Sequence, residues 1–112
     1  MESIKKINVG KEFSETPIGR YRTDSDYSGQ VFREDVLLPA LRSANFVEVN
    51  IDETEGYGSS FLDEAFGGLL RNSSFTKHDL HKKLKIVCAK SEFKIYEKMI
   101  WHYIDESSKV KK

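Results

Sequence analysis

The order of apolar and polar positions along the chain predicts strands that alternate with helices. Residues 46–52 give the clearest strand, because β-branched residues alternate there with polar ones. Residues 4–13 alternate more loosely and predict an edge strand, and residues 84–89 predict another strand. The short run 20–23 also contains strand-forming residues and is a candidate for a further strand.

Four segments have the spacing of apolar residues that is typical of helices. These segments cover residues 28–43, 60–71, 76–83 and 92–107. Ser28 is a good N-cap for the first helix, and Ser74 or Thr76 for the third. Pro39 cannot donate a backbone hydrogen bond, so we expect a kink or a break in the first helix. Alternating strands and helices favour a small α/β domain with helices layered on a sheet.

The helix predicted at residues 60–71 has two unlike faces. At roughly 100° per residue, its apolar residues fall on one half of the wheel, and the other half carries acids, an arginine, Gly67 and Gly68. Each interior glycine costs roughly 1 kcal/mol relative to alanine, so two of them need a physical reason. A helix face without side chains lets another backbone come close, which favours a flat docking face. The alternative is that Gly68 eases packing inside the domain.

From this interpretation we predict a site for a protein partner on the polar half of the helix. The predicted residues are Ser59, Ser60, Asp63, Glu64, Gly67 and Arg71. Ser59 and Ser60 otherwise read as an N-cap and a flexible turn, and the two acids favour the helix dipole on their own account.

A second hypothesis is a sensor of a small molecule or nucleotide that binds an anion at the strand ends and the start of this helix. Its predicted residues are Arg20, Arg33, Asp52, Ser59 and Ser60. Arg33 lies in the apolar stripe of the first helix, and a buried guanidinium needs a carboxylate. The acids at positions 24, 26, 34 and 52 are candidates, so a structural ion pair is the alternative account of Arg33.

The composition limits the function classes further. The chain has 112 residues, a formal net charge of zero and a single cysteine, which favours one domain of an intracellular protein without a disulfide. We expect one domain over residues 1–108 and a disordered basic tail at 109–112. Without a basic stripe or a long apolar run we expect neither nucleic-acid nor membrane binding, and a cytoplasmic location.

The chain offers little support for catalysis or for a cofactor. It contains no nucleophile–base pair with a supporting context, so we do not expect an enzyme. His78 and His81 lie three residues apart on a predicted helix, but no second cluster supplies further metal ligands. We therefore expect no metal and no cofactor. Trp101 lies off the apolar stripe of the last helix, which is typical of a contact residue or of a half-covered one.

Several short motifs together resemble the STAS-like domain family of unknown function. They are Gly19-Arg20, Ser28-Gly29, Phe32-Arg33-Glu34, Leu38-Pro39 and, above all, the fourteen residues from Gly58 to Arg71. The likeness spans roughly residues 14–90. It implies a small STAS-like α/β domain with a mixed β-sheet of about four strands, layered with about three to four helices. STAS domains are the sulfate-transporter and anti-sigma-factor-antagonist modules. The resemblance implies a regulatory protein in signal transduction that docks on a partner, with a histidine-kinase-like ATPase as one candidate.

The resemblance also bears on regulation. In anti-sigma-factor antagonists, a serine near the start of the matching helix is phosphorylated. Phe61-Leu62-Asp63 matches that motif, but Glu64 and Ala65 stand where the family has serines. Ala65 cannot be phosphorylated, so the usual phosphoserine switch is not expected here. If a switch survives in another form, Ser59 and Ser60 are the candidates, because a phosphate there would add negative charge beside Asp63.

Overall fold

Three parallel strands form the sheet of this computed structural model, which describes residues 2–110. The strands are β1 (Ile4–Asn8), β2 (Phe46–Asn50) and β3 (Leu84–Val87), in the order β1-β2-β3. Ile7, Val49 and Ile86 are aligned across the sheet and are buried on one face. The expectation of an α/β domain is confirmed, although the sheet is smaller than the predicted mixed sheet of about four strands, and it is entirely parallel.

The predicted strand at residues 20–23 is a turn instead. The amide of Tyr21 donates to the side chain of Asp24, and the amide of Asp24 donates back to the carbonyl of Tyr21. In a strand, these backbone groups would form hydrogen bonds with a neighbouring strand. Here they form the local hydrogen bonds of an aspartate turn, so no strand pairing occurs.

The first strand is shorter than the predicted span of residues 4–13. It ends at Asn8, whose side chain accepts a hydrogen bond from the amide of Lys11 and so caps the short helix α1 (Val9–Glu12). Asparagine is a favourable N-cap because its side-chain oxygen satisfies a free amide of the first helical turn. The alternation of apolar and polar residues extends past Asn8 in the sequence. The strand nevertheless ends at Asn8, because this residue caps a helix.

The first long helix is continuous over residues 29–43. It consists of α2 (Gly29–Val31), the π-helical segment η1 (Phe32–Leu37) and α3 (Leu38–Ser43), and we call it the first helical run. In the π segment the amide of Leu38 donates to the carbonyl of Arg33, five residues back. The following residue, Pro39, has no amide hydrogen to donate. The interruption expected at Pro39 is therefore a change of hydrogen-bond pattern just before it, and the helix does not break.

The second long helix is continuous over residues 59–71 and confirms the helix predicted at 60–71. It consists of α4 (Ser59–Leu62), the π-helical segment η2 (Asp63–Gly67) and α5 (Gly68–Arg71), and we call it the second helical run. Its N-cap is Gly58, and no side chain makes a capping hydrogen bond to the first turn. Ser59 and Ser60 are therefore not the N-caps that the sequence suggested.

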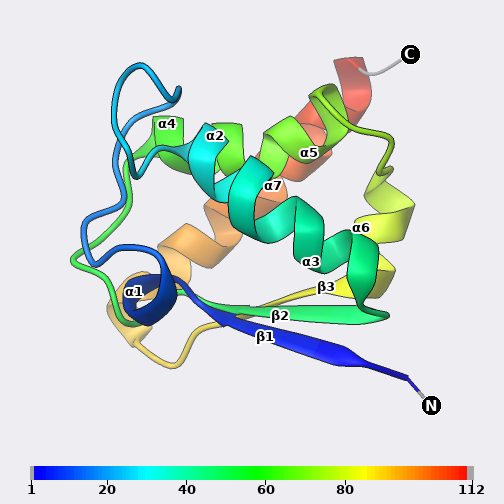
Figure 1. Ribbon diagram of the computed structural model, residues 1–112, viewed down its shortest axis with the longest axis horizontal. Helices are drawn as coiled ribbons and strands as arrows, with labels where there is room; N and C mark the ends of the chain where they lie inside the picture. The colour runs from blue at the N-terminus through cyan, green and yellow to red at the C-terminus, as the bar shows by residue number, and fades with distance from the viewer. Residues whose placement is uncertain (1, 111–112) are drawn as a thin grey trace.

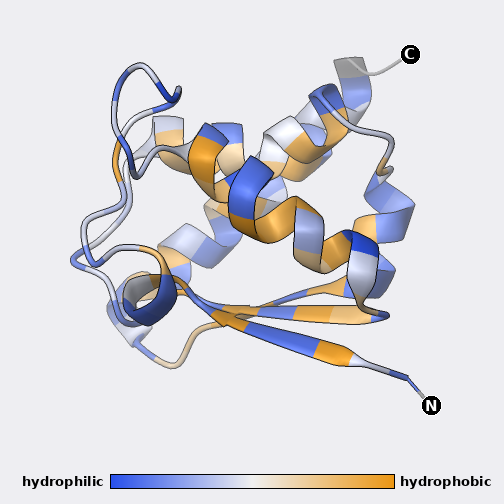
Figure 2. Ribbon diagram, in the orientation of Figure 1, coloured by the Kyte–Doolittle hydropathy of each residue, from blue (hydrophilic) through white to orange (hydrophobic). Residues whose placement is uncertain are grey.

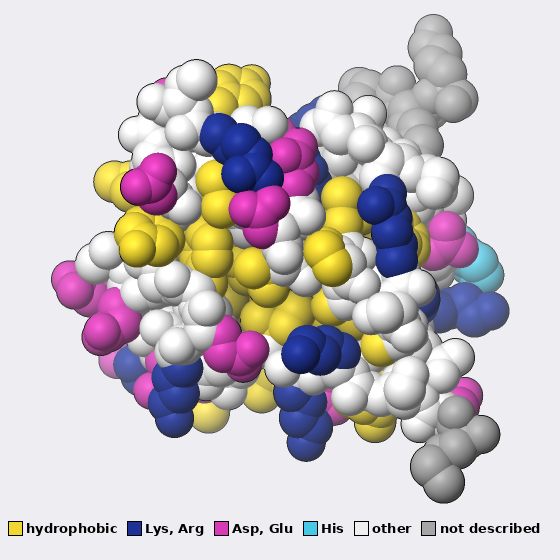
Figure 3. Space-filling view, in the orientation of Figure 1, with side chains coloured by type: hydrophobic (Ala, Val, Ile, Leu, Met, Phe, Trp, Pro, Cys, Tyr) yellow, Lys and Arg dark blue, Asp and Glu magenta, His cyan; other side chains and the backbone are white. Residues whose placement is uncertain are grey.

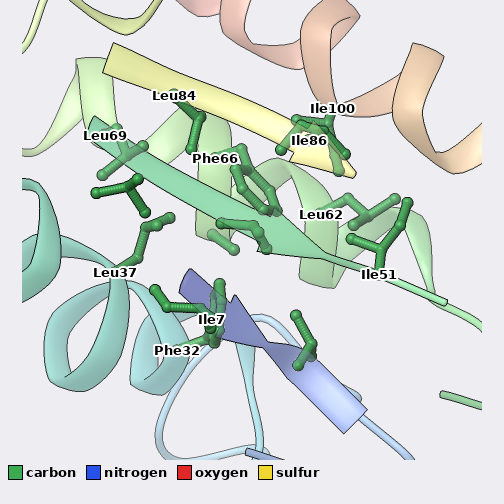
Figure 4. Close-up of a cluster of buried hydrophobic side chains, with 14 of the residues drawn as sticks. Ile7, Phe32, Leu37, Ile51, Leu62, Phe66, Leu69, Leu84, Ile86 and Ile100 are labelled. Atoms are coloured by element: carbon green, nitrogen blue, oxygen red, sulfur yellow. The ribbon is translucent and has the colours of Figure 1, made fainter. Parts of the chain in front are cut away.

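All the long helices lie on one side of the sheet. Figure 1 shows the sheet nearly edge-on with both helical runs and α7 (Lys94–Val110) above it. The second helical run lies in the middle, where it contacts the first run on one side and α7 on the other. Each helix carries hydrophobic residues beside hydrophilic ones (Figure 2), and hydrophobic side chains from strands and helices meet in one buried cluster (Figure 4).

The last helix carries the chain to the end of the described residues. A short 3₁₀ turn, η3 (Ser91–Phe93), leads into α7, which includes residues 109 and 110 of the predicted tail. Residues 111–112 lie outside the described residues. Within the part of the chain that the structure describes, no helix is long and apolar enough to cross a bilayer.

The short helix α6 (Lys77–Lys83) begins with a capping box, in which Thr76 and Asp79 exchange side-chain-to-amide hydrogen bonds. Replacing Thr76 by alanine should lower the free energy of unfolding by about 1 kcal/mol, because one amide of the first turn loses its partner. Chemical denaturation measures this change. The control is Ser74→Ala at the other candidate cap, which should stay within about 0.5 kcal/mol of wild type. An equal loss in both variants would contradict the assignment of the cap.

Candidate functional site

Three arginines converge on two neighbouring acids in the second helical run. Arg20 Nη1 lies 2.8 Å from Asp63 Oδ2, and Arg71 Nη1 lies 2.9 Å from Asp63 Oδ1. Arg33 Nη1 lies 2.6 Å from Glu64 Oε2 and also donates to the Glu64 carbonyl at 2.6 Å. We call these five residues the arginine network. It ties the loop before the first run, the first run itself and the end of the second run together.

The Arg33–Glu64 pair is the buried centre of this network. Both residues are almost fully inaccessible to solvent, and both lie in π-helical segments, η1 and η2, which contact each other. Removing one partner of a buried ion pair typically costs about 3–5 kcal/mol, because the other charge is left without a counter-charge. The structural ion pair that the sequence offered for Arg33 is confirmed, although its main partner is Glu64 and not one of the acids proposed, of which only Glu34 approaches it, at 3.4 Å.

The two glycines of the second run make room for side chains of this domain. A Cβ at Gly68 would lie 2.2 Å from Arg33 Nη1, and a Cβ at Gly67 would lie 2.7 Å from the Ser107 hydroxyl of α7. Arg71 Nη1 donates to the same hydroxyl at 2.6 Å. The flat docking face that the two glycines suggested is therefore wrong at these positions, because Arg33 and Ser107 cover them, and the alternative that Gly68 serves packing inside the domain is confirmed.

The residues of the predicted partner site are consequently divided between the surface and the interior. Ser59 and Ser60 are exposed at the start of the second run, and Asp63 and Arg71 are partly accessible. Glu64 and Gly67 are buried and face other parts of the domain. Sequence reasoning missed Ser107 as a partner of Arg71, because residues thirty-six positions apart give no local signal.

The five residues of the predicted anion site have different partners in the structure. Arg20 and Arg33 belong to the arginine network, whereas Ser59 and Ser60 lie at the start of the second run. Asp52 lies after β2 and accepts hydrogen bonds from the amides of Ala89 at 2.7 Å and Lys90 at 3.2 Å. Asp52 thus holds the chain that follows β3, which is a structural role.

A hollow of about 390 Å³ opens beside the arginine network. Its charged lining is balanced, because Arg33 and Arg71 face Glu34 and Glu64. An anion placed there would meet two carboxylates as well as two guanidinium groups, so this hollow does not have the excess positive charge of an anion site. Figure 3 shows basic and acidic side chains side by side on this helical part of the molecule.

The rings of His81 and Trp101 pack against each other. His81 stacks on Trp101 with 4.6 Å between ring centroids, and Trp101 is half-buried. Of the two interpretations of Trp101, the half-covered one is confirmed. Within residues 2–110, no group of three or more His, Cys, Asp or Glu side chains lies close enough together to hold a metal ion.

The loop before the first run exposes large apolar side chains. Ile18, Tyr21 and Tyr27 are 64%, 50% and 48% exposed. The loop is nevertheless held in place, because Arg20 is bound to Asp63 and the ring of Tyr27 packs edge-on against Phe13 at 5.7 Å. We call Ile18, Tyr21, Tyr27, Ser59 and Ser60 the loop–helix surface. Figure 1 shows this loop beside α4.

The comparison with protein families now identifies the domain. A model of the STAS-like domain of unknown function matches residues 28–92, more than half of the chain. The chain belongs to this family. No curated protein and no solved structure gives a significant match. The matched span of this STAS-like domain contains both helical runs and therefore the Arg33–Glu64 pair.

We expect Gly68→Ala to destabilise the STAS-like domain by more than about 2 kcal/mol, although alanine is the better helix former by roughly 1 kcal/mol. The new methyl group would overlap the guanidinium of Arg33, which is buried and cannot move into solvent. Denaturation midpoints measure the change. The matched control is Gly58→Ala, where a Cβ meets nothing within 4 Å. A Gly68→Ala variant as stable as wild type would contradict the packing role of this glycine.

The network also predicts a loss of stability in acid. Burial raises the pKa of Asp63, but hydrogen bonds from Arg20 and Arg71 outweigh it and hold the pKa below the ordinary value of 3.8. A carboxyl group whose pKa is lower in the folded than in the unfolded state stabilises the fold at pH values above the unfolded pKa. This stabilisation is lost as the pH falls through the folded pKa. The free energy of unfolding should therefore decrease as the pH falls below 3.8.

Denaturation at a series of pH values, comparing wild type with Asp63→Asn, measures this contribution. The variant should be less stable near neutral pH and should lose less stability in acid, because it has no carboxyl group to protonate. Asp26→Asn, at an exposed acid of the preceding loop, is the control and should follow wild type. Parallel curves for wild type and Asp63→Asn would contradict the role of this carboxylate.

Proposed function

We propose that this STAS-like domain is a non-catalytic regulatory module that docks a protein partner through the loop–helix surface. The observation that supports the proposal is the exposure of Ile18, Tyr21 and Tyr27 on one loop that is fixed to the second helical run. Clustered exposed apolar side chains are typical of interaction sites, and tyrosine is enriched among the residues that dominate binding energy. A surface that is already ordered loses little conformational entropy on binding.

The proposed surface keeps the exposed part of the sequence-based site and replaces the buried part. Ser59 and Ser60 remain at its rim, and Asp63 acts mainly by holding Arg20 and with it the loop. Glu64 and Gly67 contribute to the interior and not to the contact. By resemblance to STAS domains, a histidine-kinase-like ATPase is a candidate partner.

We further propose that the module works without the phosphoserine switch of anti-sigma-factor antagonists. Ala65, at one of the two serine positions, has no hydroxyl group and is fully buried. Glu64, at the other, is paired with Arg33 inside the domain, so its charge supports the helix crossing and does not face a partner.

The test compares the tagged wild-type domain with Ile18→Asp as baits in native cell extract, with retained proteins quantified by mass spectrometry. In the proposed interface, the Ile18→Asp change would bury a carboxylate without a counter-charge. We therefore expect this variant to reduce retention of the partner at least about tenfold. The control is Ile95→Asp, which makes the same change at an isoleucine that is 58% exposed on α7. This variant should retain the partner as wild type does.

Asp63→Lys is a less suitable variant, because Asp63 binds both Arg20 and Arg71 and its loss would disturb the fold. Thermal melting of each bait confirms that the variants are folded. A retained ATPase would then be purified, and its affinity for the three baits measured by calorimetry. Equal retention of all proteins by the three folded baits would contradict the loop–helix surface as the docking site.

A further inference from the structure

The face of the sheet that points away from the helices is uncovered in the described structure. Strand side chains alternate between the two faces, and the buried ones all lie on the helical side. The residues that alternate with them are exposed or half-buried: Ile4, Lys6, Asn8, Phe46, Glu48, Asn50, Lys85 and Val87. Figure 1 shows no helix below the sheet. All-parallel sheets almost always have both faces covered, so this sheet lacks one layer.

The uncovered face is partly apolar and hollowed. Ile4 and Phe46 lie side by side in register on β1 and β2, and Val87 lies opposite Asn50 on β3. Ile4 is among the most exposed large apolar residues of the domain. Two hollows of about 390 Å³ and 310 Å³ lie along the strands, lined in part by Phe46 and Val87 respectively. A partner can therefore bury apolar side chains in this face.

On the strands of this face the basic side chains, Lys6 and Lys85, outnumber the one acid, Glu48, although Glu12 adds a second acid to the lining of the smaller hollow. Lys6 and Lys85 stand in register on either side of Glu48, and both lysines are exposed. Lys82 is a further exposed lysine in the lining of the larger hollow. The two outer strands thus present basic side chains along both sides of β2, which complement a partner with acidic residues on both flanks.

The dimensions of the sheet fit a single helix. Three strands place the outer two about 10 Å apart, and five residues extend about 17 Å. A helix about 10 Å in diameter covers this width, and about three turns of it cover this length. We propose that the open face docks an acidic amphipathic helix of a partner protein, with its apolar stripe on Phe46 and Val87 and its acids beside Lys6 and Lys85. This surface lies on the other side of the sheet from the loop–helix surface.

The test uses isotope-labelled full chain and nuclear magnetic resonance, with a stapled helical peptide that has leucines on one face and glutamates on both flanks. Backbone amides of β1, β2 and β3 should shift on titration, and those of the loop–helix surface should not. Lys6→Glu combined with Lys85→Glu should weaken binding roughly tenfold, because two attractive pairs become repulsive. The control combines Arg42→Glu with Lys98→Glu, two exposed basic residues on helices, and should bind as wild type.

Each other result would overturn the proposal. Equal shifts with a matched peptide that carries lysines in place of the glutamates would remove the argument from charge. Strand shifts that grow with protein concentration in the absence of peptide would make a second copy of this chain the occupant. No shift in the strands with the acidic peptide would contradict the docking of an acidic helix on this face. The loop–helix surface is tested by other variants in a different experiment. If the peptide does not bind the sheet, the proposed function of the loop–helix surface is therefore unaffected.

Discussion

A buried ion pair between Arg33 and Glu64 holds the two helical runs against each other. Two charges removed from water stabilise a protein only when each has its partner in good geometry. Glu64 therefore needs Arg33, and Arg33 needs the space that Gly68 leaves beside it. Both π-helical segments occur where this pair crosses between the runs. The crossing then fixes where Asp63 points, and Asp63 fixes Arg20 and the loop that carries it.

The middle position of the second helical run explains why Glu64, Gly67 and Gly68 of its polar half are buried. The first run covers it at Gly68, and α7 covers it at Gly67. The start of this helix and the adjoining loop remain accessible, as do the uncovered strands on the far side of the sheet. The loop with its exposed apolar side chains and the uncovered face of the sheet are the two surfaces for which we propose partners.

Most elements of the fold could be predicted from the sequence because they depend on local chemistry. The alternation in β2, the apolar spacing of the second run and the cap of α6 at Thr76 require only neighbouring residues. The family resemblance was readable for the same reason, since its main motif is one continuous stretch. The predicted strand at 20–23 failed because Asp24 bonds the local backbone, which outweighs a weak strand preference.

The candidate site was less predictable, because its contacts join distant parts of the chain. The sequence by itself determined that Arg33 would need a carboxylate and that Gly67 and Gly68 needed a reason, since burial of a charge and glycine in a helix both carry a free-energy cost. Only the tertiary structure decided that the carboxylate is Glu64 and that the glycines face Arg33 and Ser107. Helix periodicity assigns residues to a face, but it does not say what covers that face, because packing between elements depends on the whole chain.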